Sequence, residues 1–229
     1  MLKPQKKVSR REIKEDKLAT TYFEARQWID ANKRLVGYIV AAPIIIVVLW
    51  FLWSQKTTEW NNKAATMLAK VLPYYDSEKY DLAVNGNPQE GVQGLQAIVD
   101  EYGSSQTGQM AKLFLANSYF ALKNYDKALQ YYDDISVKDK MTSASAYAGM
   151  AACYEIKKDF AKAASYFEKA ASKNMTLVQA PENLQRAAVN YAASGKKEKA
   201  VELMLMLKKE FPTSSVARDA DRFIAEFSS

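Results

Sequence analysis

The chain has 229 residues, of which 48% are hydrophobic, 25% charged and 12% aromatic. Only 8 Gly and 6 Pro occur, which argues against a disordered chain and a turn-rich β-sandwich and favours helices. Histidine is absent and Cys153 is the one cysteine, which excludes Ser–His and Cys–His pairs, imidazole metal ligands and an intramolecular disulfide. We interpret Cys153 as core packing beside two alanines, the alternative being a reactive thiol. We therefore expect a protein without catalytic residues, cofactor or metal.

The formal net charge of +6 is concentrated at the N-terminus. Residues 1–34 hold ten Lys or Arg and five acidic residues, whereas the remainder holds 22 basic and 21 acidic residues. A nearly neutral remainder offers no basic stripe for phosphate groups. We expect neither nucleic acid nor a small-molecule substrate as a partner.

An uncharged apolar segment of 19 residues follows the basic N-terminus, from Leu35 to Trp53. As a helix it would extend about 28 Å, close to the thickness of the bilayer hydrocarbon. Tyr38 near one end, and Trp50 and Trp53 near the other, match the aromatic belt of a membrane span. A buried core helix is the alternative, and a cleaved signal peptide fits poorly because its charged region would be too long. The segment 35–53 predicts a single transmembrane helix.

The charges on either side of this segment predict its orientation. The ten cations precede it, and the twenty residues after it contain only Lys56, Lys63 and Lys70. The positive-inside rule places residues 1–34 in the cytoplasm and the chain after Trp53 across the membrane. Leu18, Tyr22, Ala25 and Ile29 recur at helical spacing, so residues 17–33 predict an amphipathic helix. It would lie on the membrane surface or simply extend the span into water.

The chain from about residue 57 onward contains an internal repeat with steps of 35 and 37 residues. Within each unit a small residue, a tyrosine and a second alanine keep spacings of 3 and 9, which predicts two antiparallel helices joined by a polar turn. Alanines at the crossing would let the helices approach closely. The residues expected to pack the repeats are Ala116, Tyr119, Ala128 and Tyr132, then Ala151, Tyr154, Ala163 and Phe167, then Ala188, Tyr191, Ala200 and Met204.

This pattern resembles the tetratricopeptide repeat, whose helical hairpins stack into a superhelix. The sequence predicts repeats at about 109–140, 144–176 and 181–213. A degenerate hairpin over about 57–103, with its connection at Asn85-Gly86-Asn87-Pro88, would precede them, and a capping helix at 214–227 would follow. The expected fold is all-α, with an N-terminal transmembrane helix followed by a tetratricopeptide-repeat superhelix.

The resemblance implies a binding groove along the concave face, lined by the first helix of each unit. Family members that bind a C-terminal carboxylate use Lys and Asn side chains on this face. In this chain only Asn117 matches, and Leu113 stands where a lysine is needed. An apolar groove for peptide is the better interpretation. The alternative is that Met110 and Phe120 only pack against the preceding hairpin. The candidate groove residues are Met110, Leu113, Asn117, Phe120, Ala152, Glu155, Gln185 and Val189.

The whole architecture is similar to the ancillary SecYEG translocon subunit family of bacterial inner membranes. The residues that carry the likeness are Trp28-Ile29-Asp30-Ala31-Asn32 before the span and the aromatic exit from Trp50 to Trp53, followed by Leu95, Ile98, Tyr102 and Gly108. The resemblance implies a non-enzymatic inner-membrane protein with a periplasmic repeat domain, whose partners are translocon subunits or periplasmic chaperones. Two alternatives stay open: a scaffold for another envelope or energy-transducing complex, and a regulator acting through its cytoplasmic segment.

Overall fold

The computed structural model describes the backbone of residues 10–136, 139–173 and 178–228, with side chains from residue 20 onward. Lys3, Lys6 and Lys7 of the basic segment, and the side chain of Leu18, lie outside the described part. The chain divides into two compact units, 1–56 and 57–229, each of which is considered by itself.

The first unit consists of α1 (Arg10–Ala31) and the beginning of α2 (Lys33–Asp76). The two helices are separated at Asn32, whose side-chain amide and backbone N–H both donate to the carbonyl of Trp28, each at 2.9 Å. The aromatic side chains of Tyr22, Phe23 and Trp28 on α1 are exposed. Helix α2 includes Pro43, which the helix accommodates without a break.

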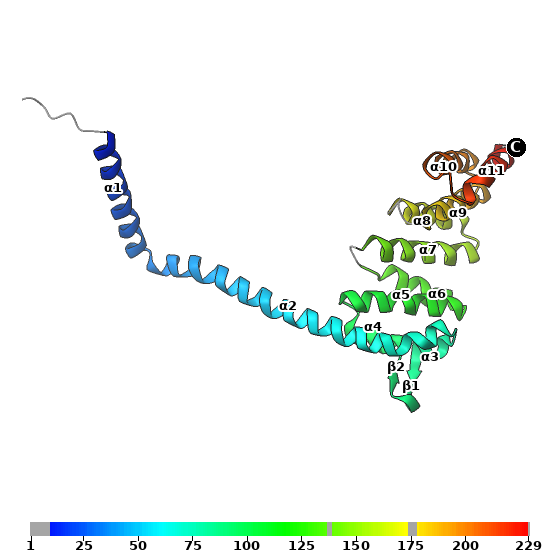
Figure 1. The fold of residues 1–229 in the computed structure, drawn as a ribbon, viewed down its shortest axis with the longest axis horizontal. Coiled ribbons are helices and arrows are strands. Elements are labelled where there is room, and N and C mark those ends of the chain that lie inside the picture. Colours follow the sequence, from blue (N-terminus) through cyan, green and yellow to red (C-terminus); the bar gives the residue numbers. More distant parts are fainter. Residues whose placement is uncertain (1–9, 137–138, 174–177, 229) are drawn as a thin grey trace, which may run out of the picture. The chain divides into compact units, whose positions relative to one another are not determined.

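The second unit is a stack of antiparallel helix pairs (Figure 1). The end of α2 is followed by α3 (Tyr80–Asn85), a short two-stranded hairpin and α4 (Leu95–Tyr102). In the hairpin, β1 (Gly86–Asn87) pairs with β2 (Val92–Gln93) across the 3₁₀ turn η1 (Pro88–Glu90). The remaining helices are α5 (Gln106–Ala121), α6 (Tyr125–Asp133), α7 (Lys140–Ile156), α8 (Phe160–Lys173), α9 (Ala180–Ala193), α10 (Lys197–Glu210), the 3₁₀ turn η2 (Val216–Asp219) and α11 (Ala220–Ser228).

The same turn joins the two helices of every pair. The turn has three residues, and the second is left-handed, with φ of 59° at Glu78, 60° at Lys123, 62° at Lys158 and 82° at Gly195. The N–H of the following residue donates to the carbonyl of the tyrosine five positions earlier, which satisfies the end of the first helix. The four bonds are Lys79 N to Tyr74 O at 2.9 Å, Asn124 N to Tyr119 O at 2.8 Å, Asp159 N to Tyr154 O at 2.9 Å, and Lys196 N to Tyr191 O at 2.8 Å.

These turns reveal that the first pair is a full repeat with an insertion. Tyr74 and Ala83 keep the tyrosine-to-alanine spacing of 9, and Ala83 is fully buried like its counterparts. The expected connection at 85–88 is therefore wrong: the helices are joined at 77–79, and the β-hairpin interrupts the second helix between α3 and α4. Gly86 and Gly94 allow the close approach, because a Cβ would lie 2.4 Å from Val92 O and 2.2 Å from Val84 O respectively.

Two clusters of buried side chains form the core of the second unit. The first joins the end of α2 with α3 to α7, and the second joins α7 to α11. Helix α7 contributes Met150 and Cys153 to the first cluster and Ala151 to the second, so it buries two faces. At the C-terminal end, Ser214 Oγ accepts from Ala217 N at 3.2 Å, and Phe227 of α11 is buried in the second cluster. Each pair therefore uses its neighbours to bury its apolar surface.

Candidate functional site

The repeated residues are the packing surface between helices. The six alanines of the two small-residue columns are fully buried, as are Phe167 and Met204. Tyr119, Tyr132 and Tyr191 are also buried, whereas Tyr154 is half-buried. The alanines stand where side chains of facing helices meet, and the larger residues fill the space beside them.

Gly149 is a packing residue that the sequence analysis missed. A Cβ at this position would lie 2.3 Å from Cζ of Tyr132, so the tyrosine ring occupies the place of a side chain. Gly149 lies in the middle of α7, where its low helix propensity would be unexplained without this contact.

Stacked tyrosines recur on the repeats and were also missed. Tyr119 stacks on Tyr131 with 5.5 Å between ring centroids and 3° between planes, and Tyr154 stacks on Tyr166 with 5.5 Å and 5°. A lysine ammonium covers each stack, Lys127 at 4.9 Å from Tyr119 and Lys162 at 5.0 Å from Tyr154. Each partner is displaced by 35 residues, so the repeat step could have revealed the motif from the sequence.

The candidate groove residues lie on α5, α7 and α9 and differ in exposure. Met110 and Val189 are 45% and 37% exposed. Leu113 and Phe120 are half-buried against the first core cluster, and Phe120 makes an edge contact with Tyr125 of its own hairpin at 5.4 Å. The remaining candidates, Asn117, Ala152, Glu155 and Gln185, are half-buried.

Asn117 is bound within the protein. Its side-chain amide donates to Tyr75 Oη at 3.2 Å, and its Oδ1 accepts from Tyr132 Oη at 2.6 Å. Burial raises the pKa of Tyr132, which keeps the hydroxyl protonated as the donor. Both ends of the Asn117 amide are therefore occupied by tyrosines, which argues against a carboxylate clamp at this residue.

Glu155 is bound in the same way by the next repeat. Its carboxylate accepts from Arg186 Nη2 at 2.5 Å and from Asn190 Nδ2 at 2.6 Å. Arg186 also stacks over the Phe167 ring at 4.1 Å. The positive charge of Arg186 is therefore committed to Glu155, so the groove has no unpaired cation at this point.

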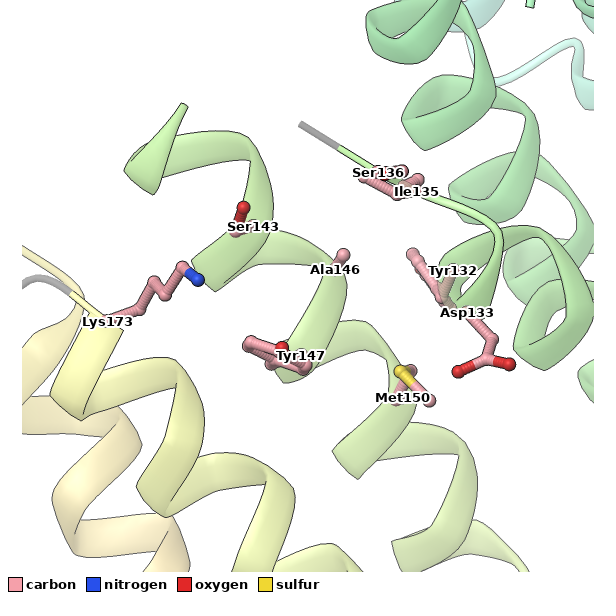
Figure 2. A pocket seen from close by; sticks show the side chains of 9 residues that line it. All are labelled: Tyr132, Asp133, Ile135, Ser136, Ser143, Ala146, Tyr147, Met150 and Lys173. Carbon is pink, nitrogen blue, oxygen red and sulfur yellow. The ribbon is translucent and has the colours of Figure 1, made fainter. Parts of the chain in front are cut away.

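A cavity of about 260 Å³ lies beside α7, between the ends of α6 and α8 (Figure 2). Its walls include the apolar side chains of Ile135, Ala146 and Met150. Figure 2 shows Asp133 and Lys173 on opposite sides of it, and the Lys173 ammonium lies 5.9 Å from the Tyr147 ring centroid. A cavity of this size admits a side chain rather than a whole metabolite.

The apolar part of α2 is exposed along its length. Among the described residues, α2 is the helix that is long and apolar enough to cross a membrane, and its most apolar window is unburied. The expected belt residues Tyr38, Trp50 and Trp53 are exposed with it. Such a surface is costly in water, which makes the helix a candidate span.

Neither a metal-binding cluster nor a reactive thiol is found in the described part of the chain. No three His, Cys, Asp or Glu residues converge on a metal site there. Cys153 is buried, and burial raises the pKa of its thiol to about 12, which disfavours the reactive thiolate. The fold is typical of interaction scaffolds.

Comparison with protein families agrees with the repeat geometry. A model described as tetratricopeptide repeat-like domain matches residues 26–176, and a tetratricopeptide repeat model matches residues 182–214. The chain belongs to the tetratricopeptide repeat-like family. The repeats of this family mediate contacts between proteins, so the second unit is a protein-interaction module. No curated protein sequence matches the chain significantly.

Solved structures show the same fold at low sequence identity. Nearly identical TPR-like repeats assigned to a kinesin light chain of Podosopora anserina align with a TM-score of 0.55 and 13% identity, over 73% of this chain and 86% of that chain. A form of those repeats with one residue substituted gives the same score and identity, over 73% and 85%. At 13% identity the likeness extends to the helical stack and not to a shared ligand.

Proposed function

We propose that this chain is a membrane-anchored interaction subunit of the protein-export machinery. The apolar part of α2 spans the inner membrane, residues 1–34 lie in the cytoplasm and the repeats lie in the periplasm. The repeats bind a translocon subunit or a periplasmic chaperone along the concave groove and perform no chemistry. The observation that carries the proposal is the presence of an exposed apolar helix and a tetratricopeptide repeat stack in one chain.

The side chains of the groove support recognition of a protein surface rather than of a charged terminus. Asn117 and Glu155 are satisfied internally, so they contribute little to an ionic clamp. Met110 and Val189 remain exposed, with Ala152 half-buried, and offer apolar contact. Anchoring in the membrane raises the effective concentration beside other membrane proteins, which compensates for weak individual contacts.

Site-specific crosslinking tests the proposal. A photocrosslinker at Met110, Leu113 or Phe120 of the full-length protein should capture an export-channel subunit or an associated chaperone, and Leu113→Glu should reduce capture from Met110. The control position is Leu205, an exposed apolar residue of α10 outside the candidate groove. Capture of a different membrane complex from Met110 would favour the scaffold function and refute the export function.

A second candidate function rests on α1. Its exposed Tyr22, Phe23 and Trp28 offer an apolar surface in the segment proposed to be cytoplasmic. In this alternative the protein is a regulator that binds a signalling partner through α1. Deletion of residues 1–33 would then abolish signalling while the repeat domain still bound its partner.

A further inference from the structure

A second cavity, of about 190 Å³, opens between α7 and α9. Its apolar wall consists of four alanines: Ala144 and Ala148 of α7, Ala170 of α8 and Ala180 of α9. Ala148 lies one helical turn before the groove candidate Ala152, and Glu182, also in the lining, lies three residues before Gln185. The cavity therefore continues the candidate groove toward the N-terminal ends of α7 and α9.

Among the described residues, the polar side chains that line this cavity have no hydrogen-bond partner. Asn183 is only 7% exposed, yet its amide makes no hydrogen bond within the described chain. The same holds for the side chains of Ser145, Gln179 and Glu182, which also line the cavity. Buried amides in folded proteins are nearly always bonded, so an unbonded one requires an explanation.

The Asn183 amide also retains contact with the cavity. Among the described residues, Oδ1 of Asn190 is the one side-chain N or O atom that is both fully enclosed and without a hydrogen-bond partner. The unbonded amide atoms of Asn183 do not meet this description, so they keep some access to solvent. The atoms of the Asn183 amide are therefore not fully enclosed, and the residue lines the cavity. An amide with one donor group and one acceptor can pair with both the C=O and the N–H of a peptide backbone.

We propose that this cavity, the α7/α9 pocket, binds an extended segment of a partner protein in which a small residue stands between lysines or arginines. The Asn183 amide pairs with the backbone of the segment, and its Ala, Ser or Gly side chain enters the alanine-lined wall. Glu182 pairs with a neighbouring cation of the segment. This inference rests on the proposed function, since it assigns a chemistry to part of the same groove.

Size and charge both favour this occupant. The volume lies below the about 300–1,000 Å³ of pockets that enclose a whole small molecule, so it accommodates one residue of a chain that continues outside. Among the described residues of the lining, Glu182 is the charged one, and the nearby Arg186 is paired with Glu155. An acidic segment would be repelled by Glu182, and the described lining offers it no compensating cation.

The test measures binding of three labelled nine-residue peptides to the full-length protein in mild detergent by fluorescence anisotropy. All are acetylated and amidated: one alternates Lys with Ala or Ser, one has Glu in place of Lys, and one has Leu in place of the small residues. The first should bind about tenfold more tightly than either of the others. Equal affinity for the Glu peptide or for the Leu peptide would overturn the proposal.

Two substitutions separate the two contacts. Asn183→Leu removes the amide at similar volume and should weaken binding of the first peptide about tenfold. The control Gln130→Leu, on the exposed surface of α6, should leave this binding unchanged. Glu182→Gln should reduce the preference for Lys over Glu, whereas Glu198→Gln, also in the first turn of its helix, should leave the preference unchanged. Unchanged binding in Asn183→Leu would refute the backbone contact.

A crosslinking arm covers the possibility that Asn183→Leu fails to fold. A photocrosslinker at Ser145 should capture the first peptide, and one at the exposed Ser172 of α8 should not. Equal capture, or capture of the chain's own residues 1–34 in place of the peptide, would overturn the proposal. If the peptide does not bind the α7/α9 pocket but export proteins are still captured from Met110, only the pocket proposal is rejected. If the peptide binds the pocket but no export protein is captured from Met110, only the export function is rejected.

Discussion

At the scale of single residues, the contact between Tyr132 and Gly149 links α6 to α7 and thereby one repeat to the next. The Tyr132 ring fills the place of a Cβ at position 149, and its hydroxyl donates to Asn117, which in turn donates to Tyr75. One tyrosine thus completes both the apolar packing and a polar chain that crosses three helices. Buried networks of this kind depend on every member being present.

Gly149→Ala should lower the free energy of unfolding by about 1–3 kcal/mol, because the added methyl group would overlap the Tyr132 ring. The gain in helix propensity, about 1 kcal/mol, offsets part of this cost. Urea unfolding followed by circular dichroism measures the difference. In a Tyr132→Leu background the same substitution should be less costly, and an equal cost in both backgrounds would show that the ring is not the obstacle.

We expect the free energy of unfolding to fall at high pH, because buried tyrosines have raised pKa values. Burial raises the pKa of Tyr132, and burial together with the hydrogen bond to Glu168 raises the pKa of Tyr191. In the unfolded chain both titrate near pH 10, so the folded state holds more protons above this pH. Their contribution is complete below pH 10 and is lost as the pH rises further; Cys153 acts in the same direction.

Urea unfolding of wild type at about pH 8 and pH 10.5 should therefore show a loss of stability at the higher pH. The double variant Tyr132→Phe, Tyr191→Phe should show a smaller loss, although it will be less stable at pH 8 because Asn117 and Glu168 lose their donors. An identical pH dependence in the two proteins would contradict the assignment to these tyrosines.

At the scale of elements, the turn between paired helices is the most regular feature of the repeats. Its left-handed residue is Glu78, Lys123, Lys158 or Gly195, so glycine occupies only one of the four positions. A side chain in this conformation is strained, and the hydrogen bond to the preceding tyrosine holds the turn in place.

Lys158→Gly should raise the free energy of unfolding by about 0.5–1 kcal/mol, because glycine removes the strain at φ 62°. Thermal unfolding monitored by circular dichroism provides the comparison. Gly195→Ala, the reverse change at an equivalent turn, should destabilise the protein. A destabilised Lys158→Gly would mean that the lysine contributes more through its side chain than it costs in strain.

The β-hairpin between α3 and α4 is held against the repeat that it interrupts. Tyr74 Oη donates to Glu90 Oε2 at 2.5 Å and accepts from Asn87 Nδ2 at 3.2 Å. The hydrogen bond to the Glu90 carboxylate raises the pKa of Tyr74. Tyr74 therefore has two roles: its carbonyl closes the turn of the first helix pair, and its hydroxyl holds the β-hairpin. The hairpin is thus fixed to the repeat whose second helix it interrupts, and the stack is kept.

At the scale of the whole molecule, the chain combines a candidate span with a repeat domain of balanced charge. The ten cations of residues 1–34 and the exposed apolar part of α2 belong to the unit 1–56, and the repeats form the unit 57–229. The asymmetry of charge about the span underlies the proposed orientation.

A reporter that folds only outside the cytoplasm, fused after Ser229, should be active, because the positive flank retains the N-terminus in the cytoplasm. Alkaline phosphatase activity in intact cells provides the measurement, and a fusion after residue 34 is the control that should be inactive. Activity of a cytoplasm-only reporter after Ser229 would refute the orientation, and loss of membrane association would refute the span.

The sequence by itself determined the all-helical repeat architecture and the candidate span. The spacings of 3 and 9 between Ala116, Tyr119 and Ala128 follow from the helical period and from close crossing, which act over a few residues. The same reasoning predicted three regular repeats and a degenerate hairpin before them. It misplaced the connection of that degenerate hairpin, because the insertion after Asn85 shifts the repeat step out of register. The spacing of 9 between Tyr74 and Ala83 is the sequence signal that would have placed this connection correctly.

Only the tertiary structure decided how the polar groups of the groove are used. Asn117 and Glu155 stand at groove positions in the sequence, but partners 15 to 42 residues away satisfy both. Asn183, which no motif singled out, is a nearly buried amide that lines a cavity and has no partner among the described residues. Sequence spacing specifies the face of a helix on which a residue lies. The packing of neighbouring helices determines what that residue meets, and so whether its hydrogen bonds are available to a ligand.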